Sequence, residues 1–320
     1  MASSQPADLP TVHVAVATYN GRRWIEQQVR SILDQDGVQV TLTISDDGST
    51  DGTAEWICQL AQVDSRVTVL PSRTGEPGVG ANFLYTLNGM EVREGEYAAF
   101  ADQDDIWRPG KLAHQVQFLR RAGVNAVSSN VLSFKRNPDG TLSKHVIRKD
   151  QPQAKWDFVF EAPGPGSTFL MDYESWSLIV NQYRRFGADG VWLHDWYVYA
   201  LVRAAGLSWM IDKEPQVAYR QHSENALGEH SGTEAVLSRF RNLRSGKYRE
   251  QFLRVAHDAA RVADEAGADR EWQNELAEMT ALLENTSIST RVKLFARFPQ
   301  IRRRRMDGFA LAVARLIGVW

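Results

Sequence analysis

The chain has little cysteine, with only Cys58 among its 320 residues. One cysteine excludes an internal disulfide framework and fits a reducing compartment. Cys58 falls in a segment with helical spacing, where we expect it to pack in the core rather than to act as a nucleophile. The chain also lacks a CxxC pair and an HExxH motif, and its glycine-rich stretch GEPGVGAN lacks the Gly-Lys-Ser/Thr ending of a P-loop. These absences exclude the simplest zinc and P-loop sites.

The sequence also has no long apolar run and no excess of charge of one sign. No stretch approaches the ~20 apolar residues that a membrane-spanning helix needs. The first ten residues, MASSQPADLP, lack a basic segment followed by an apolar one, so we expect no signal peptide. The net charge of −2 gives no general reason to expect a nucleic-acid partner. We therefore expect a cytoplasmic protein that does not bind nucleic acid.

Strand and helix patterns alternate from residue 11 to residue 101. The runs TVHVAVAT, VTLTIS, RVTVL and YAAFA predict four short strands, and the segments between them have helical spacing. This alternation is typical of a parallel sheet with helices on both faces. Ligands bind at the carboxyl ends of the strands in such sheets, so Tyr19, Asp47 and Asp102 should line one crevice.

Three aspartates follow the fourth predicted strand, in the stretch AAFADQDDIW. Asp102 and Asp104 are two positions apart and can converge on one cation, and carboxylate oxygens suit Mg²⁺ or Mn²⁺. Asp105 precedes IWRPGKL, and we expect it mainly to cap the helix that follows. An Asp-x-Asp pair is a weak motif alone, but its position at a strand end in an α/β sheet makes a cation site the better interpretation.

The second half of the chain is less regular. NPDG predicts a turn that joins VLSFK to LSKHVI as a hairpin. Strand patterns end near residue 230, and residues 231–320 read as a helical region. Its last thirty residues form a basic amphipathic tail in which eight arginines and lysines face only Asp307. Residues 291–320 can lie on an anionic membrane surface or pack on the main domain, and the pattern favours neither.

Four stretches resemble glycosyltransferase family 2: VAVATYNGRRWIEQQVRSIL, ISDDGSTDGT, FADQDDIWRPGKL and HDWY. The resemblance covers about residues 11–225. It implies a GT-A fold, which is α/β and Rossmann-like, with a mostly parallel sheet, helices on both faces and here a C-terminal helical extension. Residues 1–10 would be a flexible N-terminus, 11–105 the nucleotide-sugar half and 106–230 the acceptor half. DQDDIW and YRQH look most like bacterial enzymes that add rhamnose or related sugars to surface polysaccharides.

The resemblance also implies how the donor is bound. Ala17 and Tyr19 would lie beside the base and ribose of the nucleotide. Asp47 would accept hydrogen bonds from the base, and Asp46 would support its turn. Asp102 would reach the ribose or a metal-bound water.

The same resemblance implies a divalent cation, Mn²⁺ or Mg²⁺, that neutralises the diphosphate as it leaves. Asp104 would ligate this metal, with Asp102 beside it. His222 in YRQH would complete the metal site or touch the diphosphate, since imidazole tolerates Mn²⁺.

On the acceptor side, the resemblance makes Asp195 in HDWY the general base of an inverting, single-displacement transfer. Gly166 and Ser167 in PGPGSTFLM would lie close to the acceptor. Trp192 and Trp196 can stack on a sugar or belong to the core, and both interpretations stay open.

The predicted activity is therefore metal-dependent, inverting transfer of a sugar, with rhamnose as a candidate. The donor would be a thymidine- or uridine-diphosphate sugar, and the acceptor a hydroxyl of a glycan or lipid-linked glycan in surface polysaccharide synthesis. A nucleotidyltransferase is an alternative, but it needs a basic loop after the first strand, which ATYNGRR supplies only loosely. A second alternative is a non-catalytic module that binds a sugar nucleotide. A glycoside hydrolase also uses paired carboxylates, but the nucleotide-like first half would then have no purpose.

Overall fold

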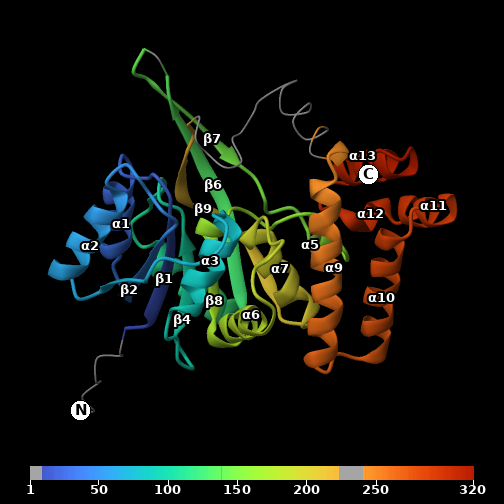
Figure 1. The fold of residues 1–320 in the computed structure, drawn as a ribbon, viewed down its shortest axis with the longest axis horizontal. Helices are drawn as coiled ribbons and strands as arrows, with labels where there is room; N and C mark the ends of the chain where they lie inside the picture. The colour runs from blue at the N-terminus through green and yellow to red at the C-terminus, as the bar shows by residue number, and fades with distance from the viewer. Residues whose placement is uncertain (1–8, 138, 223–240, 242) are drawn as a thin grey trace.

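The computed structural model describes residues 9–137, 139–222, 241 and 243–320. Its centre is a nine-stranded sheet in the order β3-β2-β1-β4-β8-β6-β9-β5, with β7 paired to β6 (Figure 1). The strands are β1 Thr11–Thr18, β2 Gln39–Asp46, β3 Val67–Val69, β4 Tyr97–Ala101, β5 Ile106–Trp107, β6 Ala126–Arg136, β7 Leu142–Ile147, β8 Leu170–Asp172 and β9 Trp209–Arg220.

The first half of the sheet is parallel, as its strand–helix alternation predicts. β1 lies between β2 and β4, β3 extends the sheet beyond β2, and all three pairings are parallel. Runs of β-branched and small residues suit these strands because both faces are covered. All five residues of YAAFA in β4 are buried.

The second half of the sheet is mixed. β8 pairs antiparallel with both β4 and β6, whereas β6 and β9 are parallel. The mostly parallel arrangement expected for the whole sheet thus holds for its first half. The hairpin predicted at NPDG is confirmed as β6–β7, which protrudes from the body of the molecule (Figure 1). The stretches LSWMID and PQVAYRQH both contribute to one long strand, β9.

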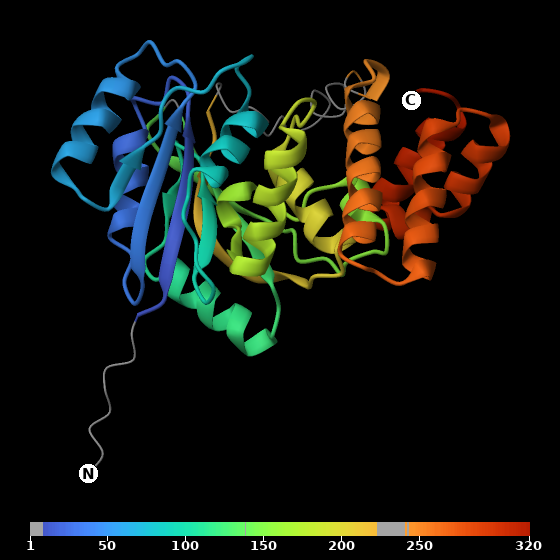
Figure 2. The same cartoon turned by 60° about the horizontal axis from the view of Figure 1, so that its bottom comes forward.

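Helices cover both faces of the sheet (Figure 2). On one face of the sheet, apolar residues are buried in a shared core by three helices: α1 (Ile25–Leu33), α2 (Thr53–Val63) and α4 (Lys111–Ala122). The helices α3 (Val79–Asn88), α6 (Tyr173–Phe186) and α7 (His194–Ala204) belong to a second core on the other face. Two short helical turns, α5 (Asp157–Phe160) and η1 (Gly166–Thr168), lie in the segment between β7 and β8.

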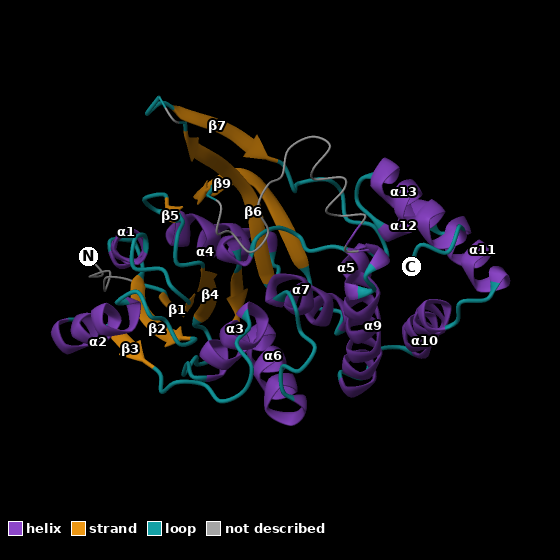
Figure 3. Ribbon diagram, turned by 45° about the horizontal axis from the view of Figure 1, so that its top comes forward, coloured by secondary structure: helices purple, strands orange, loops and turns teal. Residues whose placement is uncertain are grey.

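The C-terminal region is helical, as predicted, and comprises α9 (Lys247–Glu265), α10 (Arg270–Glu284), α11 (Ile288–Ala296), α12 (Phe298–Ile301) and α13 (Arg305–Leu316) (Figure 3). It shares a core with the acceptor half: Phe252 of α9, Leu294 of α11 and Trp196 of α7 belong to the same cluster. Tyr197 also donates a hydrogen bond to Asp258 at 2.8 Å. The boundary predicted at residue 230 lies outside the described residues.

Part of the basic tail packs on the acceptor half. Arg303 donates to the Ala162 carbonyl at 2.7 Å and lies 3.4 Å from the buried carboxylate of Asp157. Arg302 donates to the Phe160 carbonyl at 3.1 Å. These contacts favour packing on the domain for this stretch of the tail, one of the two alternatives for residues 291–320.

One expectation about the core is wrong. Cys58 lies on α2, as its spacing predicts, but its side chain is exposed. The buried residues of α2 are Thr53 and Ile57, so the position next to Ile57 points away from the sheet.

Candidate active site

The carboxyl ends of β1, β2 and β4 meet at one edge of the sheet, as the strand order requires. Thr18 pairs with Asp46, and Val16 pairs with Ala101, so the residues that follow each strand are neighbours. Tyr19, Asp47 and Asp102 therefore line one edge, as predicted. The Tyr19 side chain is 55% exposed there, which leaves its ring free to stack on a ligand.

A side-chain amide fastens the loop after β1 to the loop after β4. The Tyr19 N–H donates to Gln103 Oε1 at 2.9 Å, and Gln103 Nε2 donates to the Tyr19 carbonyl at 2.9 Å. Gly21 leaves room for this amide, because a Cβ there would lie 2.1 Å from Gln103 Oε1. Sequence reasoning missed Gln103. Its position between Asp102 and Asp104 is the sequence feature that could have indicated a role in the site.

Two aspartates at the end of β2 have different partners. Asp46 accepts hydrogen bonds from Thr18 Oγ1 at 2.8 Å and from the Ser49 N–H at 2.8 Å, which confirms that it supports the turn. Asp47 accepts from Arg73 Nη2 at 2.9 and 3.1 Å and from the Gly78 N–H at 2.7 Å. Arg73 comes from the Gly/Pro-rich loop after β3, and sequence reasoning missed it as well.

Asp104 and His222 meet across the site. Their Oδ2 and Nε2 atoms are 2.7 Å apart, and both side chains are largely buried. The imidazole also stacks on Trp24, with ring centroids 5.5 Å apart. The residues that the structure describes contain no group of three metal-ligating side chains, so Asp102 does not complete a three-residue site with this pair.

Asp105 does not cap a helix, which corrects the prediction. Its side chain is fully buried and accepts hydrogen bonds from Ser167 Oγ at 2.9 Å and from the Arg220 N–H at 3.1 Å. The helix α4 begins at Lys111 after Gly110, with no side-chain cap. Burial raises the pKa of Asp105 well above its usual value, with the charges of Asp104 and Asp102 adding to the effect.

Asp195 lies in the first turn of α7, which begins at His194 of the HDWY stretch. Burial raises the pKa of Asp195 to about 6. A hydrogen bond from the Trp196 N–H and the positive charge of Lys149 act in the opposite direction and lower it. Burial also raises the pKa of Asp102 to about 7, together with the charges of Asp104 and Asp195. Asp104 and Asp195 therefore both lie within electrostatic reach of Asp102, although Asp195 comes from a distant part of the chain.

Residues 13–177, which make up just over half of the chain, match the model of a family described as "Glycosyl transferase family 2". The chain belongs to this family. It is 36% identical over 251 residues to the dTDP-rhamnosyl transferase RfbG of Shigella flexneri, covering 77% of this chain and 84% of the relative.

Other relatives of the glycosyltransferase match over shorter spans. It is 30% identical over 119 residues to the UDP-Glc:alpha-D-GlcNAc-diphosphoundecaprenol beta-1,3-glucosyltransferase WfaP of Escherichia coli, over 37% of this chain and 45% of the relative. Among solved structures, residues 1–349 of TarS of S. aureus superpose with a TM-score of 0.55. That match has 14% sequence identity and covers 97% of this chain and 80% of that one. It supports the GT-A fold alone.

Gly166, which is predicted to lie near the acceptor, lies against His194. A Cβ at Gly166 would lie 2.2 Å from His194 Nε2, so this position requires a glycine. His194 stacks on Phe83 at 3.8 Å between ring centroids, and burial lowers its pKa to about 3. A neutral, buried imidazole is better suited to positioning its neighbours than to proton transfer.

Two predicted acceptor residues lie behind the surface of the site. Ser167 is fully buried, with its hydroxyl donated to Asp105. Trp196 is 3% exposed, and its Nε1 donates to the Phe158 carbonyl at 2.9 Å, so the core interpretation holds for it. An acceptor contact by either side chain is not supported. Trp192 is half-buried, packs edge-on against Tyr248 and keeps both roles open.

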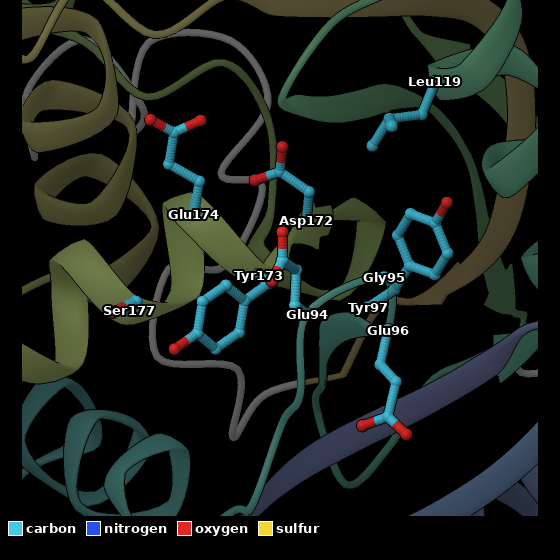
Figure 4. Close-up of a pocket in the computed structure, with 9 residues that line it drawn as sticks. All are labelled: Glu94, Gly95, Glu96, Tyr97, Leu119, Asp172, Tyr173, Glu174 and Ser177. Atoms are coloured by element: carbon cyan, nitrogen blue, oxygen red, sulfur yellow. The ribbon is translucent and has the colours of Figure 1, made fainter.

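A separate groove of about 640 Å³ lies at the other edge of the sheet (Figure 4). Its walls include Glu94, Glu96, Asp172 and Glu174. Tyr97 also lines it and begins β4, whereas Asp102 follows the other end of that strand. The groove therefore belongs to the amino end of β4, away from Asp102 and Asp104.

Proposed function

We propose that this enzyme is a metal-dependent, inverting glycosyltransferase that uses a nucleoside-diphosphate sugar, with Asp195 as the general base. The observation that carries the proposal is the convergence of Asp102, Asp104, His222 and Asp195 at the carboxyl edge of the sheet. A nucleotidyltransferase does not fit the family, and four converging catalytic groups argue against a non-catalytic module.

The donor lies along the edge formed by β1, β2 and β4. Ala17 and Tyr19 flank the base and ribose, and Asp47 faces the base from the loop that Arg73 holds. Asp102 faces the ribose or a water bound to the metal. The Gln103 amide holds the loop after β1 against the loop after β4.

The residues at the Asp104 end suit a divalent cation. Asp104 and His222 offer one oxygen and one nitrogen donor, which Mn²⁺ accepts, and Mg²⁺ typically takes one or two carboxylates plus phosphates. Burial raises the pKa of Asp102, and the negative charges of Asp104 and Asp195 raise it further; a bound cation would relieve this repulsion. When bound, the cation supplies electrostatic stabilisation of the departing diphosphate.

Asp195 takes the proton of the acceptor hydroxyl as its oxygen attacks the anomeric carbon. The bond to the diphosphate breaks as the new glycosidic bond forms, and attack from the opposite face inverts the anomeric centre. A pKa of about 6 leaves Asp195 ionised at neutral pH and still basic enough to accept the proton. Gly166 and Trp192 lie on the acceptor side.

The relatives suggest the substrates. We assign a thymidine-diphosphate sugar of the rhamnose type as the donor, ahead of a uridine-diphosphate sugar, because the RfbG match spans 84% of that dTDP-rhamnosyl transferase. The name of WfaP includes a diphosphoundecaprenol acceptor, which supports a glycan or lipid-linked glycan acceptor in surface polysaccharide synthesis. Such an enzyme would work at the inner face of the cytoplasmic membrane. The described helices include none long and apolar enough to cross a membrane.

A donor panel tests the proposal. The purified enzyme is incubated with dTDP-rhamnose and with UDP-sugars, with Mn²⁺ or with EDTA, and release of the nucleoside diphosphate is measured. We expect release from dTDP-rhamnose that depends on Mn²⁺, and proton NMR of a transfer product should show the inverted anomeric configuration. Equal release in EDTA, or a product with the donor configuration, would contradict the proposal.

A further inference from the structure

The C-terminal helix α13 is apolar on two opposite faces. Its inner face carries the buried residues Gly308, Leu311, Ala312 and Arg315, which pack against the rest of the C-terminal region. Gly308 lies so close to α12 that a Cβ there would be 2.5 Å from the Phe298 carbonyl oxygen. The inner face therefore has its partner within the chain.

The outer face of α13 has a second apolar stripe. Counting from Met306, apolar residues recur at spacings of three and four along the helix and just past its end: Met306, Phe309, Ala310, Val313 and Ile317. Met306 is 76% exposed and Ile317 is 70% exposed. The neighbouring helix α11 adds Ile288, which is 77% exposed, and Val292. A contiguous apolar stripe exposed on a helix is the pattern of an interaction surface, so this face calls for a partner.

Cations lie at both ends of the stripe. Arg304 and Arg305 precede it and are exposed. Arg291 lies at the other end, where a Cβ on Gly318 would be 2.6 Å from its Nη1. Among the described residues, these three and Lys293 form no ion pair with a carboxylate. Arg297, Arg302 and Arg303, by contrast, are paired with acids, as Arg297 is with Glu278.

We propose that the outer face of α11 and α13 lies on an anionic lipid surface. Apolar side chains on one face of a surface helix, with cations at its edges, are the pattern of helices that lie in the membrane interface. The charge of the rim favours lipid over a second copy of this chain, since a symmetric dimer through the same face would bring two basic rims together. This contact is independent of the transfer chemistry, and it accounts for the part of the tail that does not pack on the acceptor half.

Vesicle binding tests the contact. The full chain is centrifuged with vesicles of equal phosphatidylglycerol and phosphatidylcholine, and with vesicles of phosphatidylcholine alone. We expect binding to the anionic vesicles that weakens in 0.5 M salt (about a twofold shorter screening length than at 0.1 M). Arg304→Gln with Arg305→Gln should weaken binding about 25-fold, at about fivefold per charge. Met306→Glu should weaken it at least about tenfold, because it removes apolar area and adds repulsion.

Val63→Glu is the matched control, since Val63 is an 82% exposed apolar residue on α2, far from α13 (Figure 1). It should bind vesicles as the wild type does. All variants should retain donor hydrolysis in solution, which separates loss of lipid binding from loss of fold or of transfer. The proposal is overturned if the wild type ignores anionic vesicles, or if the α13 variants bind like Val63→Glu. A dimer in light scattering that Met306→Glu dissociates would overturn it in favour of a second copy.

Discussion

His222 Nε2 lies 2.7 Å from Asp104 Oδ2, although 118 positions separate the two residues in the chain. The contact closes the site between the loop after β4 and the segment after β9. It brings a nitrogen ligand beside the second aspartate of the Asp-x-Asp pair, which is where the proposed cation needs it.

His222→Ala should weaken Mn²⁺-dependent binding of the nucleoside diphosphate at least about tenfold, because one nitrogen donor and the partner of Asp104 are both lost. Isothermal titration calorimetry at several Mn²⁺ concentrations measures this. His145→Ala, an exposed histidine on β7, serves as the control and should bind as the wild type does. Unchanged Mn²⁺ dependence in His222→Ala would remove His222 from the metal site.

Asp195→Asn should lower the transfer rate about 10²–10⁴-fold, because the amide cannot accept the acceptor proton. Affinity for donor and Mn²⁺ should change little, since the substitution is isosteric. Single-turnover kinetics and calorimetry separate the two effects. Asp264→Asn on α9 removes an exposed carboxylate and should be neutral. A wild-type rate in Asp195→Asn would exclude the base assignment.

The rate of transfer should fall below about pH 6, where Asp195 becomes protonated and stops accepting a proton. At pH 5 about one-tenth of this group remains ionised, so the rate should be about one-tenth of its plateau. Lys149→Met should move the acidic limb of the pH–rate profile to higher pH, because the Lys149 charge lowers the pKa of Asp195. Rates from pH 4.5 to 8.5 at saturating Mn²⁺ check both statements. A limb that stays in place or moves to lower pH in Lys149→Met would contradict them.

Arg303→Met should lower the free energy of unfolding by about 3 kcal/mol, because it removes one of two arginines from a buried carboxylate. Asp157 is fully buried, with Arg203 and Arg303 each 3.4 Å away and a hydrogen bond from the Tyr199 hydroxyl at 3.0 Å. Urea denaturation measures the change. Arg304→Met, one residue on and exposed, should change stability by less than about 0.5 kcal/mol. Equal stability of the two variants would show that the C-terminal region does not depend on this ion pair.

The donor edge could be predicted from the sequence because it depends on local patterns. The strand runs are short and β-branched, and each ends in polar residues, so the carboxyl edge of the parallel sheet follows from chain order. Asp46, Asp47 and Asp102 then fall where the structure has them. Asp195 was placed by resemblance, and the raised pKa values now link it to Asp102.

Contacts between distant segments could not be predicted in the same way. Asp105 looks like a helix cap locally, but β9 and the turn at Gly166–Thr168 bury it and supply its hydrogen bonds. Trp196 and Ser167 lie in motifs that suggest ligand contact, yet the helix α7 and the turn η1 point them inward. Arg73 and Gln103 are single polar residues in loops, and only the folded chain shows which backbone or carboxylate each one meets.

The central claim is that the Asp-x-Asp pair holds the metal that binds the donor diphosphate, and Asp104→Ala tests it most directly. Calorimetry with thymidine diphosphate, with and without Mn²⁺, gives the affinity of the wild type and of the variant. The account predicts that Mn²⁺ strengthens binding to the wild type and has no effect on binding to Asp104→Ala. Equal Mn²⁺-dependent affinity in the two proteins would contradict it.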